Sequence, residues 1–212
     1  EPFGWKEGVN KLYYTLSSDY LSKNPMQKVL LLDNHDEARF FSLVGENVEK
    51  QKMGFQWLLT CRGIPQLYYG NEILMKGASN PDGWVRLDFP GGWEGDQSNK
   101  FTEAGRTQKE NNIFNYIKRL ANYRKTSSAI KTGKMMQFYP VDGVYVYFRY
   151  DAKQTVMCVM NTNAEPKTID LNRFMERIGS SQTAFDVAAG VAFRLEKNLQ
   201  LMPMSNLVLE LK

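Results

Sequence analysis

Four consecutive polar residues follow a short, continuously apolar run. The run Val29-Leu30-Leu31-Leu32 leads directly into Asp33-Asn34-His35-Asp36. If the run is a buried strand of a parallel α/β fold, its carboxyl end opens into the loops where ligands bind, and these side chains can converge on a substrate. Alternatively, the Asn-His-Asp segment is a turn that caps the strand or the next helix. Position alone leaves both interpretations open.

His35 is the only histidine of the chain, and this restricts the possible chemistry. A Ser-His-Asp triad would have to use it, but the sequence has no Gly-x-Ser-x-Gly elbow, and one histidine with two cysteines does not make a zinc site. The Gly-x-Gly-x-x-Gly and Walker patterns are also missing, which argues against dinucleotide or nucleotide binding. Carboxylate chemistry remains, with the histidine as a hydrogen-bond donor.

Two further segments could carry chemistry. Residues 63–72 read Gly-Ile-Pro-Gln-Leu-Tyr-Tyr-Gly-Asn-Glu, and residues 80–93 belong to a long loop rich in Gly, Asn, Asp and Trp. Long loops without regular structure in compact domains tend to be functional or mobile. Trp, Asp and Arg together suit a sugar, because the ring stacks on its apolar face and the charged groups bind its hydroxyls. The alternatives are a buried strand with a glycine turn, and a solvated surface loop.

The elements that position these motifs alternate between helices and short strands. Apolar residues at helical spacing predict helices over residues 8–21, 48–62 and 108–125, and short apolar runs predict strands over residues 28–33 and 64–69. This order is typical of α/β units with a parallel sheet.

The pattern changes near residues 127–128. Val144, Val146 and Phe148 alternate with other side chains at a period of two, and Asp142-Gly143 supplies a hairpin turn before them. A helical turn is predicted over residues 173–178, and further strands are predicted over residues 156–160, 168–171, 184–187, 191–195 and 207–211. This part of the chain is predicted to be an antiparallel sandwich of about 80 residues.

The composition is that of a globular chain. Of the 212 residues, 42% are hydrophobic and 24% are charged, which allows a real core and argues against disorder. The 27 basic residues exceed the 23 acidic ones by 4 but are scattered, so nucleic acid is not an expected partner. No apolar run approaches the roughly 20 residues of a membrane span. Cys61 and Cys158 are expected to be separate buried thiols.

The ordered motifs resemble the C-terminal part of the α-amylase superfamily of glycoside hydrolases. The resemblance covers the whole chain and rests on Leu-Asp-Asn-His-Asp at residues 32–36 with Arg39, on Gly-Ile-Pro-x-x-Tyr-Tyr-Gly-x-Glu at residues 63–72, and on the Asp-x-x-x-Arg spacing of Asp82 and Arg86. It is greatest for the neopullulanase and cyclomaltodextrinase branch. Residues 86–93 also resemble a loop of a subgroup found in starch-utilisation systems.

The resemblance implies a fold class of α/β plus all-β. Residues 1–127 would be the C-terminal portion of a catalytic (β/α)₈ TIM barrel, with residues 28–33 as strand 7 and residues 64–69 as strand 8. Residues 128–212 would be an antiparallel β-sandwich C-terminal domain. A barrel cut in this way leaves an open strand edge, so self-association through that edge is expected.

The resemblance also implies roles for four residues. Asp36 is similar to the carboxylate after strand 7 that supports the oxocarbenium-like transition state, and His35 resembles a donor to sugar hydroxyls. Asp82 and Arg86 would grip the next glucose on the non-reducing side. In the family this loop often begins with Asp-Pro, whereas here Pro81 precedes Asp82.

The family mechanism is retaining and needs a nucleophile and an acid/base about 5 to 5.5 Å apart. These two carboxylates follow barrel strands 4 and 5, whose motifs are absent from this sequence. We therefore expect the C-terminal part of an enzyme that hydrolyses α-1,4-glucosidic bonds of maltooligosaccharides, cyclodextrins or pullulan, inactive by itself. Two alternatives stay open: a non-catalytic carbohydrate-binding module, and a structural domain in which Asp36 and Arg86 form only a local ion pair.

The expected partner is an α-glucan oligosaccharide, and no cofactor is expected. Calcium occurs in the family, but no ligand cluster in this sequence supports it. The starch-utilisation resemblance favours a periplasmic or secreted protein, whereas the cyclomaltodextrinase resemblance also permits the cytoplasm.

Overall fold

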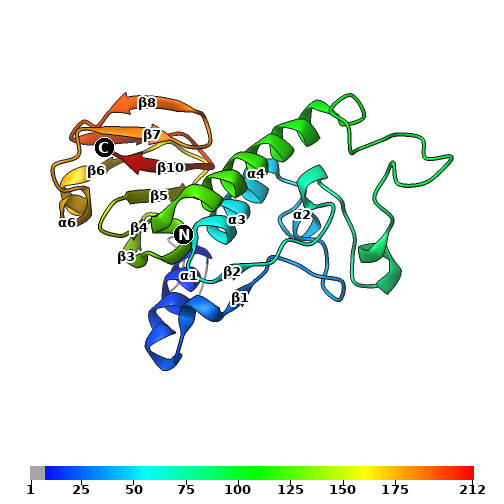
Figure 1. The fold of residues 1–212 in the computed structure, drawn as a ribbon, viewed down its shortest axis with the longest axis horizontal. Coiled ribbons are helices and arrows are strands. Elements are labelled where there is room, and N and C mark those ends of the chain that lie inside the picture. Colours follow the sequence, from blue (N-terminus) through cyan, green and yellow to red (C-terminus); the bar gives the residue numbers. More distant parts are fainter. Residues whose placement is uncertain (1–7) are drawn as a thin grey trace. The chain divides into compact units, whose positions relative to one another are not determined.

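The computed structural model describes residues 8–212, and the chain divides into two compact units (Figure 1). Of the described residues, the first unit takes 8–28, 59–64 and 120–212, and the second takes 29–58 and 65–119. The predicted domains, residues 1–127 and 128–212, stay a prediction.

Helices and a long loop make up most of the second unit. The elements that lie wholly or partly in it are β1 (Val29–Leu30), α2 (Phe40–Leu43), α3 (Val48–Thr60), β2 (Ile64–Pro65), η3 (Asn71–Ile73), η4 (Asp82–Arg86) and α4 (Gln108–Thr126). The predicted helices over residues 48–62 and 108–125 are thus confirmed as α3 and α4. Both are amphipathic, and Phe55, Leu58 and Ile113 are buried side chains of their apolar faces.

The strands β1 and β2 form a two-stranded sheet. The amide of Ile64 donates to the carbonyl of Lys28 at 2.9 Å, and the amide of Gln66 donates to the carbonyl of Leu30 at 2.8 Å. Donor and acceptor positions advance along the chain together, so the two strands are parallel, as the sequence predicts.

Both strands are shorter than predicted. Instead of spanning residues 28–33 and 64–69, they have two residues each. Val29 and Leu31 are 54% and 38% exposed, although the continuous apolar run predicts burial on both faces. A strand is buried on both faces only when other strands and helices enclose it. Within residues 8–212, β1 and β2 have only each other as sheet neighbours, so the predicted full burial was wrong.

The first unit contains an all-antiparallel sandwich. Its helical elements are α1 (Gly8–Ser17), η1 (Ser18–Leu21), η2 (Pro25–Gln27), α5 (Ser128–Thr132), η5 (Leu171–Phe174) and α6 (Met175–Ile178), and its strands are β3 (Lys134–Val141), β4 (Val144–Tyr150), β5 (Thr155–Asn161), β6 (Lys167–Asp170), β7 (Thr183–Asp186), β8 (Val191–Arg194), β9 (Asn198–Leu201) and β10 (Ser205–Leu211). One sheet has the order β3-β4-β5-β10-β7-β8 and the other pairs β6 with β9. All these pairings are antiparallel, so the predicted sandwich is confirmed.

The predicted Asp-Gly hairpin turn joins β3 to β4. Val141 pairs with Val144, and the two residues between them, Asp142 and Gly143, have φ angles of 48° and 68°. Positive φ at both positions matches the right-handed twist of the two strands. The strand β3 itself was not predicted. It is an edge strand and contains Pro140, whose missing N–H is tolerated only at such an edge.

The core of the sandwich is one apolar cluster. It is made of Val144, Val146, Phe148, Met157, Val159, Leu171, Phe174, Ile178, Ala184, Leu201, Leu209 and Leu211. The opposite face of β4 is buried as well, since Tyr145, Tyr147 and Arg149 are all 0% exposed. The strand therefore lies between two packed layers.

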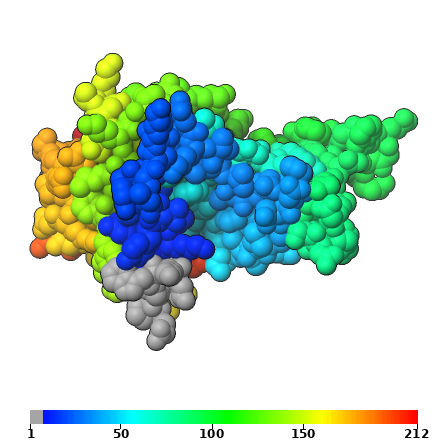
Figure 2. All heavy atoms as spheres, turned by 90° about the horizontal axis from the view of Figure 1, so that it is seen from below, coloured from blue at the N-terminus to red at the C-terminus, as the bar shows by residue number. Residues whose placement is uncertain are grey.

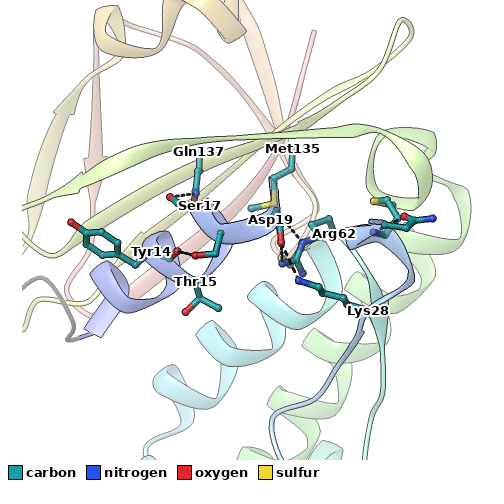
Figure 3. A network of polar contacts seen from close by, with 12 residues as sticks. Tyr14, Thr15, Ser17, Asp19, Lys28, Arg62, Met135 and Gln137 are labelled. Atoms are coloured by element: carbon teal, nitrogen blue, oxygen red, sulfur yellow. Dashed lines mark hydrogen bonds and ion pairs between the residues drawn. The ribbon is translucent and has the colours of Figure 1, made fainter. Parts of the chain in front are cut away.

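A polar network ties the N-terminal helices to the rest of the first unit (Figure 3). The guanidinium of Arg62 donates from both Nε and Nη2 to the carboxylate of Asp19, and Lys28 Nζ lies 3.7 Å from the same carboxylate. The amide of Gln137 donates to Ser17 Oγ at 3.2 Å. These bonds link η1 to residues 59–64 and α1 to β3.

Candidate functional site

Residues 33–36 form a turn at the end of β1. Asn34 Oδ1 accepts hydrogen bonds from the amides of Asp36, at 2.8 Å, and Glu37, at 3.1 Å. This Asx turn fixes the local backbone. It leaves the side chain of Asp36 64% exposed. The turn and the binding interpretation are therefore compatible, because the turn presents the carboxylate.

Asp33, directly before Asn34, is buried and accepts hydrogen bonds on both carboxylate oxygens. It is 1% exposed; its Oδ2 accepts from the amide of Phe40 at 2.7 Å and its Oδ1 accepts from Asn71 Nδ2 at 2.6 Å. The first bond satisfies an amide at the N-terminus of α2, where a carboxylate is favoured. The second fixes the segment after β2. Asp33 thus connects the two segments that follow the paired strands.

Arg86 joins the predicted site residues to one another. Its Nη2 lies 3.2 Å from Asp36 Oδ1 and 3.1 Å from Asp82 Oδ1. Its Nε donates to the carbonyl of His35 at 2.9 Å, and His35 Nε2 lies 3.3 Å from Asp36 Oδ2. The structure therefore brings all four residues into one group, which we call the Arg86 cluster.

The short helix η4 places Arg86 and Asp82 in this group. Four positions apart in a helical turn, the two side chains lie on the same side and meet. Val85 of η4 is 0% exposed, so its side chain packs inside the second unit. Just after the helix, the carbonyl of Leu87 accepts a 2.7 Å hydrogen bond from Tyr69 Oη, so the loop is attached to the segment that follows β2.

The Arg86 cluster is open to solvent. The side chains of Asp36, Asp82 and His35 are 62–64% exposed, and that of Arg86 is 44% exposed. Ion pairs this exposed contribute about 0–1 kcal/mol to stability, so a stabilising role does not explain the convergence of four polar side chains. Carboxylates and a guanidinium a hydrogen bond apart can bind neighbouring hydroxyl groups from both sides. The group is therefore suited to a polyhydroxylated ligand.

Arg39 is a buried residue that contacts the two tyrosines of residues 63–72. Its side chain is 0% exposed, its Nη1 donates to the carbonyl of Tyr69, and its guanidinium carbon lies 4.1 Å and 4.6 Å from the ring centres of Tyr68 and Tyr69. Cation–π contacts of this kind strengthen when they are desolvated. Arg39 thereby fixes the two tyrosines of the Gly-Ile-Pro-Gln-Leu-Tyr-Tyr-Gly motif.

The second unit also has an open cavity of ≈ 370 Å³. It is lined by Leu67, Tyr68, Tyr69, Glu72, Phe114, Ile117 and Lys118. Burial raises the pKa of the Glu72 carboxyl above its ordinary value. No residue of the Arg86 cluster lines this cavity, so it is a separate feature of the surface.

Residues 8–212 contain no metal-binding cluster and no membrane-spanning helix. No set of three or more His, Cys, Asp or Glu side chains in that range is arranged to hold a metal ion. Over the same residues, no helix has both the length and the apolar content needed to cross a bilayer.

Asp33, Arg39 and Tyr69 belong to the quoted motifs, but the sequence assigned them no role. The structure shows that they support the site; Asp33 and Arg39 are 1% and 0% exposed, and Tyr69 is 38% exposed. The available signal was position: each is a polar or aromatic residue close to the carboxyl end of an apolar run. Which of them is buried depends on packing and could not be obtained from the run itself.

Two family models match this chain in sequence order. Residues 5–103 match the model described as the α-amylase catalytic domain, and residues 135–210 match the model of the cyclomaltodextrinase C-terminal domain. The cyclomaltodextrinase of Thermoanaerobacter pseudethanolicus is 29% identical over 142 residues, which is 67% of this chain and 22% of that protein. The cyclomaltodextrin glucanotransferase of Bacillus licheniformis is 30% identical over 183 residues, which is 86% of this chain and 22% of that protein. The chain thus spans 22% of the length of each.

Solved structures share the fold. An α-amylase from Geobacillus thermoleovorans, solved with acarbose, superposes with a TM-score of 0.78 at 22% identity, over 98% of this chain and 44% of that one. An Anoxybacillus α-amylase superposes with a TM-score of 0.74 at 23% identity, over 97% of this chain and 43% of that one. The expected fold class, the last part of a TIM-barrel catalytic domain followed by an all-β domain, is confirmed by these matches.

Proposed function

We propose that this chain is the C-terminal part of a retaining glycosidase, because residues 5–103 match the model of the α-amylase catalytic domain and residues 135–210 match that of the cyclomaltodextrinase C-terminal domain. The substrate class is α-1,4-linked glucan: maltooligosaccharides, cyclodextrins or pullulan. The relatives reported above, a cyclomaltodextrinase and a cyclomaltodextrin glucanotransferase, support this class.

The observation that carries the proposal is the bridge formed by Arg86. It lies within 3.2 Å of Asp36 and 3.1 Å of Asp82, two carboxylates far apart in sequence, and it is exposed enough to be reached by a ligand. An arginine fork can exchange a carboxylate partner for sugar hydroxyls with little loss of hydrogen bonding. We assign Asp82 and Arg86 to the binding of one glucose unit.

Asp36 has the electrostatic role in this proposal. Cleavage of a glycosidic bond develops positive charge at the anomeric carbon, and a carboxylate placed close to that charge lowers the barrier. His35 lies beside it and supplies a hydrogen-bond donor to hydroxyls of the same sugar. Neither residue replaces the nucleophile or the acid/base, so we propose that the chain binds oligosaccharide and does not cleave it.

The test measures binding and turnover separately. Calorimetric titration of the chain with maltoheptaose should show weak binding, and incubation with the same sugar should release no reducing ends above the blank. Arg86→Met should weaken binding about tenfold, or about 1.4 kcal/mol, because the bidentate donor is lost. Arg86→Lys should recover only part of the affinity, since lysine keeps the charge without the fork.

Arg194→Met is the matched control, because Arg194 is an exposed arginine of β8 in the other unit. It should bind maltoheptaose as the parent chain does. Turnover by the chain would refute the inactivity, and equal affinity for the Arg86→Met variant and the parent would refute the assigned site.

A further inference from the structure

We propose that Gly77 and Tyr69 are the positioning residues of the Arg86 cluster: together they hold η4 where Arg86 reaches Asp36. Neither residue belongs to the cluster itself. The inference rests on the proposed function and deepens it, because it names two residues outside the sugar site on which the geometry of that site depends.

The backbone of Gly77 is bound to the segment that follows the turn of the site. Gly77 is buried; its carbonyl accepts a 2.9 Å hydrogen bond from the amide of Arg39, and its amide donates to Ser42 Oγ at 3.1 Å. Arg39 lies three positions after Asp36, and Ser42 lies in α2. These two bonds attach Gly77 to the same segment that carries Asp36.

Gly77 also lies directly against the backbone of η4. A Cβ on Gly77 would lie 2.3 Å from the carbonyl oxygen of Trp84 and 3.1 Å from the Cα of Val85, and no side-chain rotation can move these backbone atoms away. The φ of Gly77 is outside the left-handed region, so only the close approach requires glycine here. Figure 2 shows the atoms of α2, in lighter blue, beside the blue-green atoms of this part of the chain.

Tyr69 supplies a second contact, at the C-terminal end of η4. Its Oη donates to the carbonyl of Leu87, the residue directly after η4, at 2.7 Å, and its own carbonyl accepts from the buried side chain of Arg39. Gly77 contacts the middle of η4 and Tyr69 contacts its end. The position of Arg86, the last residue of η4, is therefore set by contacts on both sides.

The hydrogen bonds of Arg86 leave little room for a shift of η4. Arg86 Nη2 lies 3.2 Å from Asp36 Oδ1. Ordinary contact with the Trp84 carbonyl begins at 3.4 Å, so a methyl group on residue 77 would push η4 away by about 1 Å. A 3.2 Å hydrogen bond lengthened by that amount is lost. A sugar that bridges the two segments then loses its contacts with one of them, because a binding group must be held to about 0.5 Å.

The first test is calorimetric titration of two glycine variants with maltoheptaose. Gly77→Ala should weaken binding about fivefold, because η4 is displaced. Gly83→Ala is the matched control: Gly83 lies in η4 itself, and a Cβ there meets nothing within 4 Å, so affinity should change less than about twofold. Tyr69→Phe keeps the ring and removes only the bond to Leu87, and it should weaken binding about threefold.

The second test needs no sugar. His35 is the only histidine of the chain and its carbonyl accepts from Arg86 Nε, so its ring NMR signal reports on the Arg86 cluster. At one fixed pH, Gly77→Ala and Tyr69→Phe should move this signal in the direction that Arg86→Met does, and Gly83→Ala should leave it in place. A residue that only stabilised the fold would lower the urea midpoint without moving the signal.

The outcomes separate the inference from the proposed function. Parent affinity or an unmoved His35 signal in Gly77→Ala overturns the inference, while a loss of binding with Arg86→Met leaves the proposed function standing. If Gly77→Ala does not fold, Tyr69→Phe decides, and parent affinity in that variant overturns the inference. A parent chain that does not bind maltoheptaose overturns both.

Discussion

At the scale of single residues, two aspartates three positions apart have opposite environments. Asp33 is buried, and its two carboxylate oxygens accept hydrogen bonds from Phe40 and Asn71. Asp36 is largely exposed, and its carboxylate contacts Arg86 and His35 of the Arg86 cluster. The Asx turn at Asn34 lies between the two aspartates and separates the buried position from the exposed one. One aspartate therefore stabilises the site and the other remains free to meet a ligand.

Asp33→Asn should lower the free energy of unfolding by about 2 kcal/mol. The amide can accept from only one of the two donors, so the amide of Phe40 or Asn71 Nδ2 loses a charge-assisted hydrogen bond inside the protein. Urea unfolding followed by tryptophan fluorescence measures the change. Asp88→Asn, at an exposed aspartate of the same unit, is the control and should cost less than about 0.5 kcal/mol. Equal stability of the two variants would contradict a supporting role for Asp33.

At the scale of elements, two arginines donate hydrogen bonds to backbone carbonyls at the C-terminus of α3. Arg149 Nη1 donates to the carbonyl of Thr60 at 2.8 Å, and Arg124 Nη1 and Nη2 donate to the carbonyls of Leu59 and Gly63 at 2.9 and 2.7 Å. Burial lowers the pKa of both guanidinium groups. Positive side chains at this end also complement the helix dipole. A strand and a helix of the first unit thereby fix where α3 ends.

Arg149→Met should destabilise the chain by about 3 kcal/mol. Methionine fills a similar volume, but the buried carbonyls of Thr60 and Gly133, which accept from Arg149 at 2.8 and 2.9 Å, would lose these charge-assisted hydrogen bonds. Thermal unfolding followed by circular dichroism measures the loss. Arg194→Met, the same change at an exposed strand position, should leave the melting temperature almost unchanged. A similar melting temperature for both variants would show that the carbonyls find other donors.

At the scale of the whole molecule, the parallel pair of strands keeps apolar surface exposed. Val29, Leu31, Leu67 and Tyr69 are 54%, 38%, 44% and 38% exposed, and all four lie in or next to β1 and β2. Sheets of this kind are normally covered on both faces, and an open edge offers unpaired backbone groups to another chain. The surface is therefore suited to pairing.

We expect the chain to self-associate through this surface. Light scattering coupled to size-exclusion chromatography should show a mass that rises with concentration, because exposed apolar area is removed from water on pairing. The double variant Leu31→Lys with Leu67→Lys should remain monomeric. Leu43→Lys, at a leucine of α2 that is 62% exposed, is the control and should associate as the parent does. A parent chain that is monomeric at every concentration would contradict this expectation.

The sequence alone indicated the family and most of the elements. Periodicity predicted α3, α4 and most of the sandwich strands, and Asp142-Gly143 predicted the hairpin turn, because such features depend on interactions within a few residues. It did not predict the edge strand β3, whose residues lack a clear alternation, or the short strand β9, although the four residues of β9 alternate between polar and apolar. The order of the motifs was enough to indicate the α-amylase family, which the two family models confirm.

Only the tertiary structure decided which residues meet. That Arg86 contacts Asp36, that Asp33 is buried beneath the turn, and that Arg149 binds the end of α3 all depend on the path of the chain between residues far apart in sequence. The same is true of the exposure of Val29 and Leu31, whose apolar run predicts burial. Local patterns fix the conformation of a segment, but burial and contact are set by what packs against it.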